Sequence, residues 1–409
     1  MKAGWITTPL SQLCDIKHGF AFKSEFFTGS GDHVLLTPGN FHESGGYRDR
    51  GDKQKYYSGE IPDGFVLSEG DLLVAMTEQA AGLLGSPILV PESGNFLHNQ
   101  RLGLVTKKAG AAWTNEFFFH VFNSDAVRKA IHDSATGVKV RHTSPSKIGE
   151  VIVTIPASLA EQRRIVGILD EAFEGLATAK ANAEQNLQNA RALFESHLQA
   201  VFTQRGHGWV EKTLGEEIDL LAGFAFKSAQ YTNRDQDVRL LRGDNIIQGC
   251  LRWDDVKKWP ANDVDAYESY QLREGDVVLA MDRPWVKAGL KHATISPDDL
   301  PCLLVQRTAR LRGSAKLNNR FLMYLIGSAA FTRHILGVQT GIGVPHISGQ
   351  QIKDFEFVLP PEAEQRRIAD NLETLREETQ RLESLYQRKL AALDELKKSL
   401  LHRAFSGQL

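Results

Sequence analysis

The chain contains the same stretch of sequence twice, and this duplication limits its possible folds more than any other feature. The hexapeptide Ala-Glu-Gln-Arg-Arg-Ile occurs at 160–165 and again at 363–368, a spacing of 203 residues. Further pairs lie at offsets between 203 and 206: Gly-Phe-Ala-Phe-Lys-Ser at 19–24 and 223–228, Glu-Gly-Asp at 69–71 and 274–276, Gln-Arg at 100–101 and 306–307, Thr-Gly at 136–137 and 340–341. The 409 residues therefore contain two copies of one unit, each a globular part followed by a long helix.

Apolar residues in alternating steps of four and three follow both copies of the hexapeptide. The predicted seams are Ile165, Leu169, Ala172, Leu176, Ala179, Ala183, Asn186, Ala190, Leu193, His197, Val201 and Ile368, Leu372, Leu375, Thr379, Leu382, Tyr386, Lys389, Leu393, Leu396, Leu400. Such sustained heptads predict a coiled coil. If the helices run antiparallel within the chain, small residues face large ones, so we expect an intrachain pair roughly 65 Å long. The alternative is pairing with another protein, for which His197 and Lys389 leave room.

Each globular copy mixes β-rich and helical segments. Apolar runs at 71–76 and 276–281 follow Glu-Gly-Asp turns, and runs at 151–155 and 355–359 end at proline, so all four predict strands. Helical spacing at 115–131 and 318–336 predicts one helix in each copy. We therefore predict an α+β fold with a mainly antiparallel sheet. The expected domains are 1–157 and 206–360, separated along the chain by spacer helices at 158–205, after a capping box at Ser158 and Glu161, and 361–409.

Composition indicates an ordinary globular protein, because 42% of the residues are apolar, 24% are charged and the formal net charge is −2. The three cysteines form no Cys-x-x-Cys pair, which argues against zinc and against a disulfide framework. No run approaches the length of a membrane span, and the N-terminus lacks an apolar signal core, so we expect a cytoplasmic protein with no membrane partner.

No complete catalytic motif is present. Lys23 and Lys227 are not preceded by the glycine of a phosphate loop, and Arg283 interrupts the Asp-Pro-Pro-aromatic pattern of adenine methyltransferases at 282–285. His142 and His346 occupy equivalent places without a metal-ligand partner at useful spacing, so we expect surface or core-edge histidines. We therefore expect a chain that is not an enzyme and has neither a metal site nor a cofactor of its own.

Signals for nucleic-acid binding are stronger than signals for catalysis. The loops after 71–76 and 276–281 differ between the copies, which is typical of one scaffold that reads two targets. The candidate DNA-binding residues there are Thr77, Gln79, Arg283, Trp285 and Lys287, with Arg48, Arg50, Lys53, Lys55, Lys139, Arg141, Arg242, Asn245 and Lys257 nearby. Gln79 suits adenine and Arg283 suits guanine. Lys23, Ser24, Lys227 and Ser228 are identical in both copies, which favours backbone contacts or domain folding. On composition alone, an ordinary solvated face is the competing interpretation.

Taken together, the duplicated texts, the two helices and the segment Ala-Phe-Ser-Gly-Gln-Leu at 404–409 resemble the specificity (S) subunits of type I restriction–modification systems. The resemblance covers essentially the whole chain. It implies two target-recognition domains that each read one half of a bipartite asymmetric site in double-stranded DNA. It also implies helices that set the spacer and dock two methyltransferase subunits, with an ATP-dependent restriction subunit recruited to the complex. S-adenosylmethionine, ATP and magnesium would then belong to the partners.

Under this resemblance Arg163, Arg164, Arg366 and Arg367 of the repeated hexapeptide become candidates for partner docking or inter-helix contacts. The alternative function is a structural adaptor whose domains bind proteins and whose coiled coil acts as a spacer.

Overall fold

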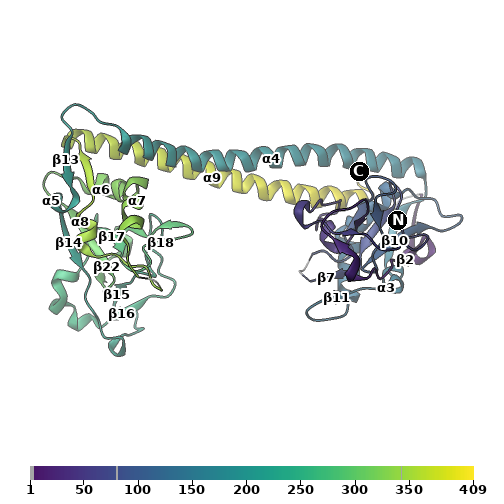
Figure 1. Cartoon of the computed structure of the whole chain (residues 1–409), viewed down its shortest axis with the longest axis horizontal. Helices are drawn as coiled ribbons and strands as arrows, with labels where there is room; N and C mark the ends of the chain where they lie inside the picture. Colours follow the sequence, from purple (N-terminus) through teal and green to yellow (C-terminus); the bar gives the residue numbers. More distant parts are fainter. Residues whose placement is uncertain (1–3, 80–81, 342) are drawn as a thin grey trace. The chain divides into compact units, whose positions relative to one another are not determined.

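The computed structural model describes residues 4–79, 82–341 and 343–409 (Figure 1). Ala80, Ala81 and Ile342, which belong to predicted loops, lie outside the described residues. The chain forms two compact units: unit 1 comprises Met1–Glu184 and Arg388–Leu409, and unit 2 comprises Gln185–Gln387. Each unit therefore contains one globular copy and one segment of each long helix.

Unit 1 contains an antiparallel sheet at its centre. Its strand order is β2 (Cys14–His18), β10 (Leu102–Lys107), β6 (Leu72–Ala75) and β8 (Pro87–Leu89). A second sheet has the order β3 (Phe27–Thr28), β5 (Tyr56–Tyr57), β4 (Val34–Leu35) and β9 (Phe96–Leu97), in which β4 and β9 are parallel. Two antiparallel pairs complete the set: β1 (Trp5–Pro9) with β12 (Ile152–Pro156), and β7 (Thr77–Glu78) with β11 (Arg141–His142).

Unit 2 repeats this plan. Its central antiparallel sheet has the order β14 (Ile218–Ala222), β22 (Thr308–Gly313), β17 (Val277–Ala280) and β20 (His292–Thr294). The other strands are β13 (Val210–Thr213) with β23 (Glu356–Leu359), β16 (Lys257–Trp259) with β15 (Val238–Leu241) and β21 (Cys302–Leu304), and β18 (Trp285–Val286) with β19 (Gly289–Leu290). The matching strand orders show that the sequence duplication is a duplication of structure.

The expectation of one helix in each globular copy was wrong, because each predicted segment forms two helices that meet at a serine. They are α1 (Asn115–Asn123) and α2 (Asp125–Ser134) in unit 1, and α6 (Asn319–Gly327) and α7 (Ala329–Val338) in unit 2. The Ser328 hydroxyl accepts a hydrogen bond from the backbone N–H of Phe331 at 3.2 Å. This N-cap gives one of the free backbone N–H groups at the start of α7 a partner, so that donor is not left unpaired by the break. The apolar period hides the break because residues on both sides remain buried.

Short helices fill the connections between the strands. The α-helices are α3 (Pro145–Gly149), α5 (Leu214–Glu217) and α8 (Gly349–Lys353). The 3-10 helices are Leu10–Gln12, Ser24–Phe26, Pro38–Asn40, Gly51–Lys53, Ser228–Gln230, Ala261–Tyr270 and Pro297–Asp299. The main core of each unit lies between the central sheet, the helix pair and the long helices, with Trp113 stacked on Phe118 at 3.9 Å in unit 1.

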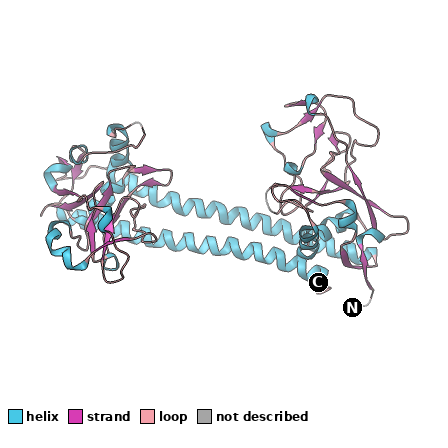
Figure 2. Cartoon of the chain, turned by 90° about the horizontal axis from the view of Figure 1, so that it is seen from below, coloured by secondary structure: helices cyan, strands magenta, loops and turns pink. Residues whose placement is uncertain are grey.

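The long helices α4 (Leu159–Thr203) and α9 (Glu362–Phe405) lie side by side (Figure 2), and the sequence colours of Figure 1 show that they run antiparallel within each unit. In unit 1, Lys180 Nζ lies 2.9 Å from Asp394 Oδ1, and Leu401 and Ala404 are buried in the same core as Leu169. In unit 2, Arg191 Nε lies 2.9 Å from Glu383 Oε2. The predicted intrachain coiled coil is therefore confirmed, and pairing with another protein is not required for either segment.

The predicted seam is wrong at several positions, although Ala190 is buried and Val201, Leu393 and Leu400 are half-buried as predicted. Leu193 is 51% exposed and Leu396 is 47% exposed, and Asn186, His197 and Lys389 also face solvent. Beside the predicted Ala190 and Val201, the inner face of α4 uses Phe194 and Leu198 in place of Leu193 and His197, and that of α9 uses Leu390 and Lys397 in place of Lys389 and Leu396. The reason is tertiary: Phe194 and Phe202 pack against Tyr324 and Phe321 of α6 (ring centroids 6.4 and 5.4 Å apart), which turns this face of α4 toward the domain. A strict heptad also drifts around a straight helix.

The glutamine of each repeated hexapeptide anchors its helix to the globular copy. Gln162 and Gln365 are both fully buried. Gln162 Nε2 donates to the carbonyls of Pro156 and Ala112 at 3.0 and 2.8 Å. Gln365 Nε2 donates to Pro360 and Lys316, both at 2.8 Å, and its Oε1 accepts from the N–H of Asn318. The repeated text therefore marks a joint between sheet and helix.

The structure offers no sign of a metal site or a single membrane-spanning helix in the parts it describes. No group of three or more His, Cys, Asp or Glu side chains is placed to hold a metal ion there. Cys14, Cys250 and Cys302 are free thiols, and burial raises the pKa of Cys14 and Cys302 to about 12. Across the described ranges, no single helix has the length and apolarity to cross a membrane. The helices α6 and α7, which are bent by 61° where they meet, reach that length and apolarity only when taken together.

Candidate nucleic-acid interface

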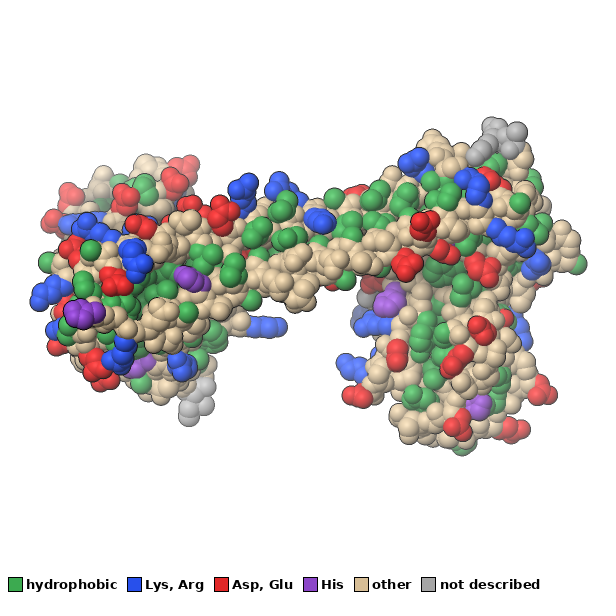
Figure 3. Space-filling model, turned by 90° about the horizontal axis from the view of Figure 1, so that it is seen from above, with side chains coloured by type: hydrophobic (Ala, Val, Ile, Leu, Met, Phe, Trp, Pro, Cys, Tyr) green, Lys and Arg blue, Asp and Glu red, His purple; other side chains and the backbone are tan. Residues whose placement is uncertain are grey.

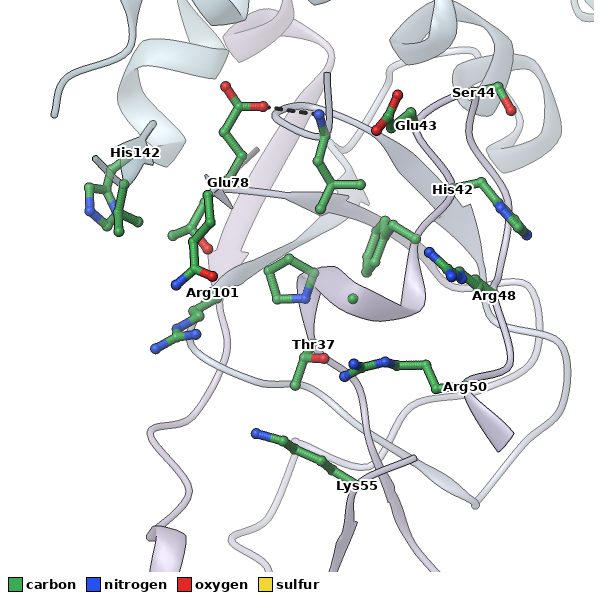
Figure 4. A pocket seen from close by; sticks show the side chains of 17 residues that line it. Thr37, His42, Glu43, Ser44, Arg48, Arg50, Lys55, Glu78, Arg101 and His142 are labelled. Carbon is green, nitrogen blue, oxygen red and sulfur yellow. Dashed lines mark hydrogen bonds between the residues drawn. The ribbon is translucent and has the colours of Figure 1, made fainter. Parts of the chain in front are cut away.

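Unit 1 has a cleft of about 900 Å³ between the turn after β4, the loop after β6 and the strand β11 (Figure 4). We call it the unit 1 cleft. Its lining includes Thr37, Gly39, His42, Glu43, Arg48, Arg50, Lys55, Thr77, Glu78, Gln79, Arg101 and His142. These residues come from five separated parts of the sequence, and the sheets bring them together.

A buried asparagine builds one wall of the unit 1 cleft. The Oδ1 of Asn40 accepts from the backbone N–H of Thr37 at 3.0 Å, and its Nδ2 donates to Gln54 Oε1 at 2.8 Å. The backbone N–H of Arg48 donates to the carbonyl of Asn40 at 2.7 Å. These bonds hold the turn at 37–40 against the segment at 48–54, and so fix the backbone from which Arg48 and Arg50 project.

Four cations surround the unit 1 cleft. Arg48, Arg50, Lys55 and Arg101 form no ion pair within the described ranges, although Lys55 Nζ lies 5.4 Å from the ring centroid of Phe27. Figure 4 shows Arg48 and Arg50 on one side and Arg101 on the other. The guanidinium of Arg50 lies against Gly39, where an added Cβ would sit 3.0 Å from an Arg50 nitrogen. A cleft with this charge suits an anionic ligand that offers hydrogen-bond acceptors.

Of the two acids that line this cleft, Glu43 and Glu78, the second is hydrogen-bonded to the backbone. Glu78 is buried, and its Oε2 accepts hydrogen bonds from the N–H groups of Gly82, Leu83 and Leu84 at 3.1, 2.9 and 2.9 Å. Its Oε1 has no hydrogen bond and lies 3.8 Å from His132 Nε2. The loop after β6 is thus folded inward around one carboxylate, which leaves Gln79 exposed at the cleft.

Unit 2 has the same frame with different side chains. Asn245 Oδ1 accepts from the N–H of Arg242 at 3.1 Å, and its Nδ2 donates to the carbonyl of Arg252 at 3.0 Å, as Asn40 does with Thr37 and Arg48. The N–H of Met281 donates to the carbonyl of Arg307 at 2.8 Å, which matches Met76 and Arg101 at 3.0 Å. The equivalent backbone therefore carries a different set of functional groups in each unit.

The cations of unit 2 are closer to acids than those of unit 1. Arg242 and Lys257 both contact Asp255, at 3.5 and 2.9 Å, and Arg307 lies 3.5 Å from Asp282. Burial lowers the pKa of Lys291, and the charge of Asp244 acts in the opposite direction. Figure 3 shows positive and negative side chains interspersed on the visible face of each unit.

The predicted DNA-binding residues are partly gathered by the fold. Arg48, Arg50, Lys55, Thr77 and Gln79 line one cleft, whereas Lys53, Lys139 and Arg141 do not. Arg141 donates to the carbonyl of His132 at 2.7 Å, and Asn245 is 3% exposed and supports a turn. Lys23 and Ser24 lie at the start of one 3-10 helix, and Lys227 and Ser228 at the start of its counterpart. Trp285 and Lys287 belong to the β18–β19 hairpin.

Sequence reasoning missed Thr37, Arg101 and His142 in unit 1, and Lys291 in unit 2. The signal for Arg101 was present, because Gln-Arg occurs at equivalent places in both copies. Thr37 and Lys291 have no such signal, since their counterparts are Arg242 and Ser86.

Comparison with known proteins finds similarity to one family. The family model "Type I restriction modification DNA specificity domain" matches residues 207–389. The EcoAI specificity subunit of Escherichia coli is 40% identical over 169 residues, which cover 41% of this chain and 28% of that protein. The EcoBI specificity subunit of E. coli is 23% identical over 99% of this chain and 86% of its own length. Residues 207–389 match a type I restriction–modification DNA specificity domain, and the chain as a whole is similar to type I specificity subunits.

The fold agrees with that of solved specificity subunits. The HsdS subunit from Thermoanaerobacter tengcongensis aligns with a TM-score of 0.63 at 20% identity, covering 100% of this chain and 98% of that one. A chain from a structure of the type I R-M system aligns with a TM-score of 0.76 at 18% identity, covering 100% and 99%. At these identities the likeness supports the fold alone.

In this chain the hexapeptide arginines are exposed and mostly paired locally. Arg164 contacts Glu161 at 2.8 Å, Arg367 contacts Glu364 at 3.0 Å, and Arg366 contacts Glu362 at 2.5 Å. Arg164 also donates to the carbonyl of Leu409 at 2.9 Å, within unit 1. Arg163 is exposed. These side chains lie on the outer surface of the helix starts.

Proposed function

We propose that this chain is the non-catalytic DNA-recognition subunit of a type I restriction–modification complex, and that each globular copy reads one half of a bipartite asymmetric site. The observation that carries the proposal is the duplicated frame with different side chains. Thr77, Glu78 and Gln79 stand where the other copy has Asp282, Arg283 and Pro284, directly after the matching contacts of Met76 with Arg101 and of Met281 with Arg307. An asymmetric two-part DNA sequence requires two domains that share a frame and carry different contact residues.

The unit 1 cleft has the chemistry for one half-site. An arginine can donate two hydrogen bonds to the O6 and N7 of guanine, and a glutamine amide can bond both N6 and N7 of adenine in the major groove. Arg50, packed against Gly39, and the exposed Gln79 are our candidates for these contacts. Lys55 and Arg101, at the exposed edge, suit phosphate oxygens, which hold register without reading sequence.

The long helices are assigned two roles in this proposal. As an antiparallel pair they set the number of base pairs between the half-sites, and their outer faces dock two methyltransferase subunits. Arg163, Arg164, Arg366 and Arg367 are the proposed docking residues. S-adenosylmethionine, ATP and magnesium would be bound by the methyltransferase and restriction subunits, so this chain needs no cofactor of its own.

The test is to map methylated adenines in cells with and without this chain. We expect one gapped, asymmetric motif to lose its methylation when the chain is absent. An unchanged methylome would refute the proposal. A matched variant that carries Arg50→Ala should retain the half-site read by the second copy and relax the other.

The alternative function, a structural adaptor, predicts a different result. An adaptor would still co-purify with its protein partners, but deletion of the chain would leave every methylated motif in place. Loss of a motif therefore supports DNA recognition and rejects a purely structural role.

A further inference from the structure

The loops after β6 and β17 have the same length but different conformations. They span residues 77–85 and 282–290, and the backbone closes both at equivalent places, where Ala75 N–H donates to Ser86 and Ala280 N–H to Lys291. In unit 1 the carboxylate of Glu78 accepts three backbone N–H groups and folds the loop inward. Arg283 occupies the equivalent position in unit 2, and a guanidinium cannot accept a hydrogen bond.

The unit 2 loop instead forms a β-hairpin. Trp285 pairs with Leu290 and Val286 with Gly289, so that Lys287 and Ala288 form a two-residue turn. The hairpin is braced at its base, because the N–H of Lys291 donates to Pro284 at 2.8 Å and Gln248 Nε2 donates to Gly289 at 3.2 Å. Leu290 is buried beneath it.

The fold leaves one apolar side chain partly uncovered on each face of the hairpin. Trp285 is 41% exposed and Val286, on the opposite face of the strand, is 39% exposed. Trp285 makes no aromatic contact in the described parts of the chain, whereas Trp113 and Trp259 lie in aromatic clusters. An exposed tryptophan at a fixed position is typical of a binding contact rather than of a core.

The charges around this surface fit a polyanion. Arg283, Lys287 and Lys291 lie within ten residues of hairpin sequence, and Asp282 is the only acid there. Asp282 is already 3.5 Å from Arg307. The occupant that combines negative charge with apolar groups on a groove floor is double-stranded DNA, since the 5-methyl group of thymine projects into the major groove and that groove admits a two-stranded ribbon.

We propose that the β18–β19 hairpin enters the major groove of the second half-site and that the Trp285 indole reads a thymine through its 5-methyl group. The proposal rests on the proposed function and adds a base and a contact to it. Lys287 at the turn contacts a phosphate. The two half-sites are thus read by different chemistry: hydrogen bonds in the unit 1 cleft and an apolar contact in unit 2.

Partial exposure favours this contact over insertion between base pairs. More than half of Trp285 is already covered by its own unit, and the turn residues lie beyond it. A side chain that unstacks a base step must offer both faces of its ring or project as a wedge. Trp285 presents one surface at a braced position, which suits contact with a methyl group.

The experiment measures binding of the full chain to duplexes in which deoxyuridine replaces each thymine of its motif in turn. This change removes one methyl group and keeps the base pairing. We expect one position in one half-site to weaken binding by about fourfold, as loss of one buried methyl predicts. Trp285→Ala should bind more weakly and lose all sensitivity at that position, while Trp285→Phe should retain it.

Val286→Ala is the matched control, because it shortens an equally exposed side chain on the other face of the hairpin. It should keep the deoxyuridine effect. Equal deoxyuridine sensitivity in wild type and Trp285→Ala would overturn the proposal, and so would loss of sensitivity in Val286→Ala alone. Normal DNA binding by Trp285→Ala with loss of methyltransferase association would assign the hairpin to a protein partner instead. Failure of wild type to distinguish the motif from a scrambled duplex would reject the proposed function itself.

Discussion

The side-chain amide of Gln365 donates a hydrogen bond to the carbonyl of Pro360 at 2.8 Å, across the junction where β23 ends and α9 begins. Gln162 and Pro156 make the same contact at 3.0 Å at the start of α4. Each glutamine also donates to a loop of its own globular copy. The joint between strand and helix is therefore fixed by one buried amide in each copy.

Gln365→Ala should destabilise unit 2, because the N–H of Asn318 and the carbonyls of Lys316 and Pro360 lose their partner. We expect a loss of about 3 kcal/mol in the free energy of unfolding. Urea unfolding of the full chain followed by circular dichroism measures it. Gln387→Ala, an exposed glutamine on the same helix, is the control and should change little. Equal stability of the two variants would contradict the anchoring role.

Gly19→Ala and Gly223→Ala should both be strongly destabilising, although neither glycine has a positive φ. A Cβ on Gly19 would lie 2.1 Å from the carbonyl oxygen of Asn99, and one on Gly223 would lie 2.0 Å from that of Val305. Because the clashing atoms belong to the backbone, they cannot move aside as a side chain can. We therefore expect the free energy of unfolding to fall by about 3 kcal/mol or more. Thermal unfolding of the full chain measures the loss. In that assay Gly29→Ala should be neutral, because a Cβ at Gly29 has nothing within 4 Å.

Arg50→Lys should weaken discrimination at one base pair of one half-site, because an ammonium cannot form the paired hydrogen bonds of a guanidinium. We expect a loss of about 1–3 kcal/mol at that position and little change elsewhere. Competition binding with single-base variants of the motif measures it. Lys53→Ala removes a nearby cation that does not line the cleft, and its pattern of discrimination should match wild type. A uniform loss in Arg50→Lys would instead indicate a phosphate contact.

Mild acid should weaken unit 1 through His98. Burial is the main cause that lowers the pKa of His98 to about 4 in the folded protein, and its Nε2 bonds the carbonyl of Leu102 at 3.0 Å. Because the unfolded chain binds the proton more readily, stability falls as the pH drops from about 6.5 toward 4. Between pH 7 and pH 5 the expected loss is about 2 kcal/mol. His98→Gln keeps a donor without titrating, so its loss over this range should be smaller by that amount; an identical loss would contradict the assignment.

Insertion of one heptad at facing positions of α4 and α9 should lengthen the gap in the recognised motif and leave both half-sites unchanged. Seven residues preserve the apolar stripe, whereas an insertion of five in each helix should disrupt the pairing. Methylome mapping reads gap and half-sites together. Altered half-sites with an unchanged gap would show that the helices do not set the spacing.

Much of the fold was predictable because the duplication presents each local sequence pattern twice. The strands at 72–75 and 277–280 and the starts of α4 and α9 follow from apolar runs, proline and capping residues. The breaks at Ser124 and Ser328 were missed because the apolar period continues across them. The seam positions Leu193 and His197 were misplaced because packing of Phe194 and Phe202 on α6, not the heptad, decides which face is buried.

The candidate site was predictable only in part. Arg48, Arg50 and Gln79 were found as local clusters of suitable side chains, but Arg101 and His142 reach the unit 1 cleft from distant strands. Their proximity depends on sheet register, which the sequence pattern does not specify. Asn245 was proposed as a base contact because its amide can donate and accept hydrogen bonds. In the fold both amide groups are already hydrogen-bonded to the backbone of a turn.

The make-up of the two units has a consequence for biosynthesis. Unit 2 is one continuous segment, Gln185–Gln387, whereas the core of unit 1 includes Leu401 and Ala404 from a segment synthesised about two hundred residues after the rest of that unit. On the ribosome, unit 2 can close first, while the apolar groove of unit 1 around Ile165 and Leu169 waits for α9 to emerge. The unit that begins first along the chain is therefore the one whose core is completed last.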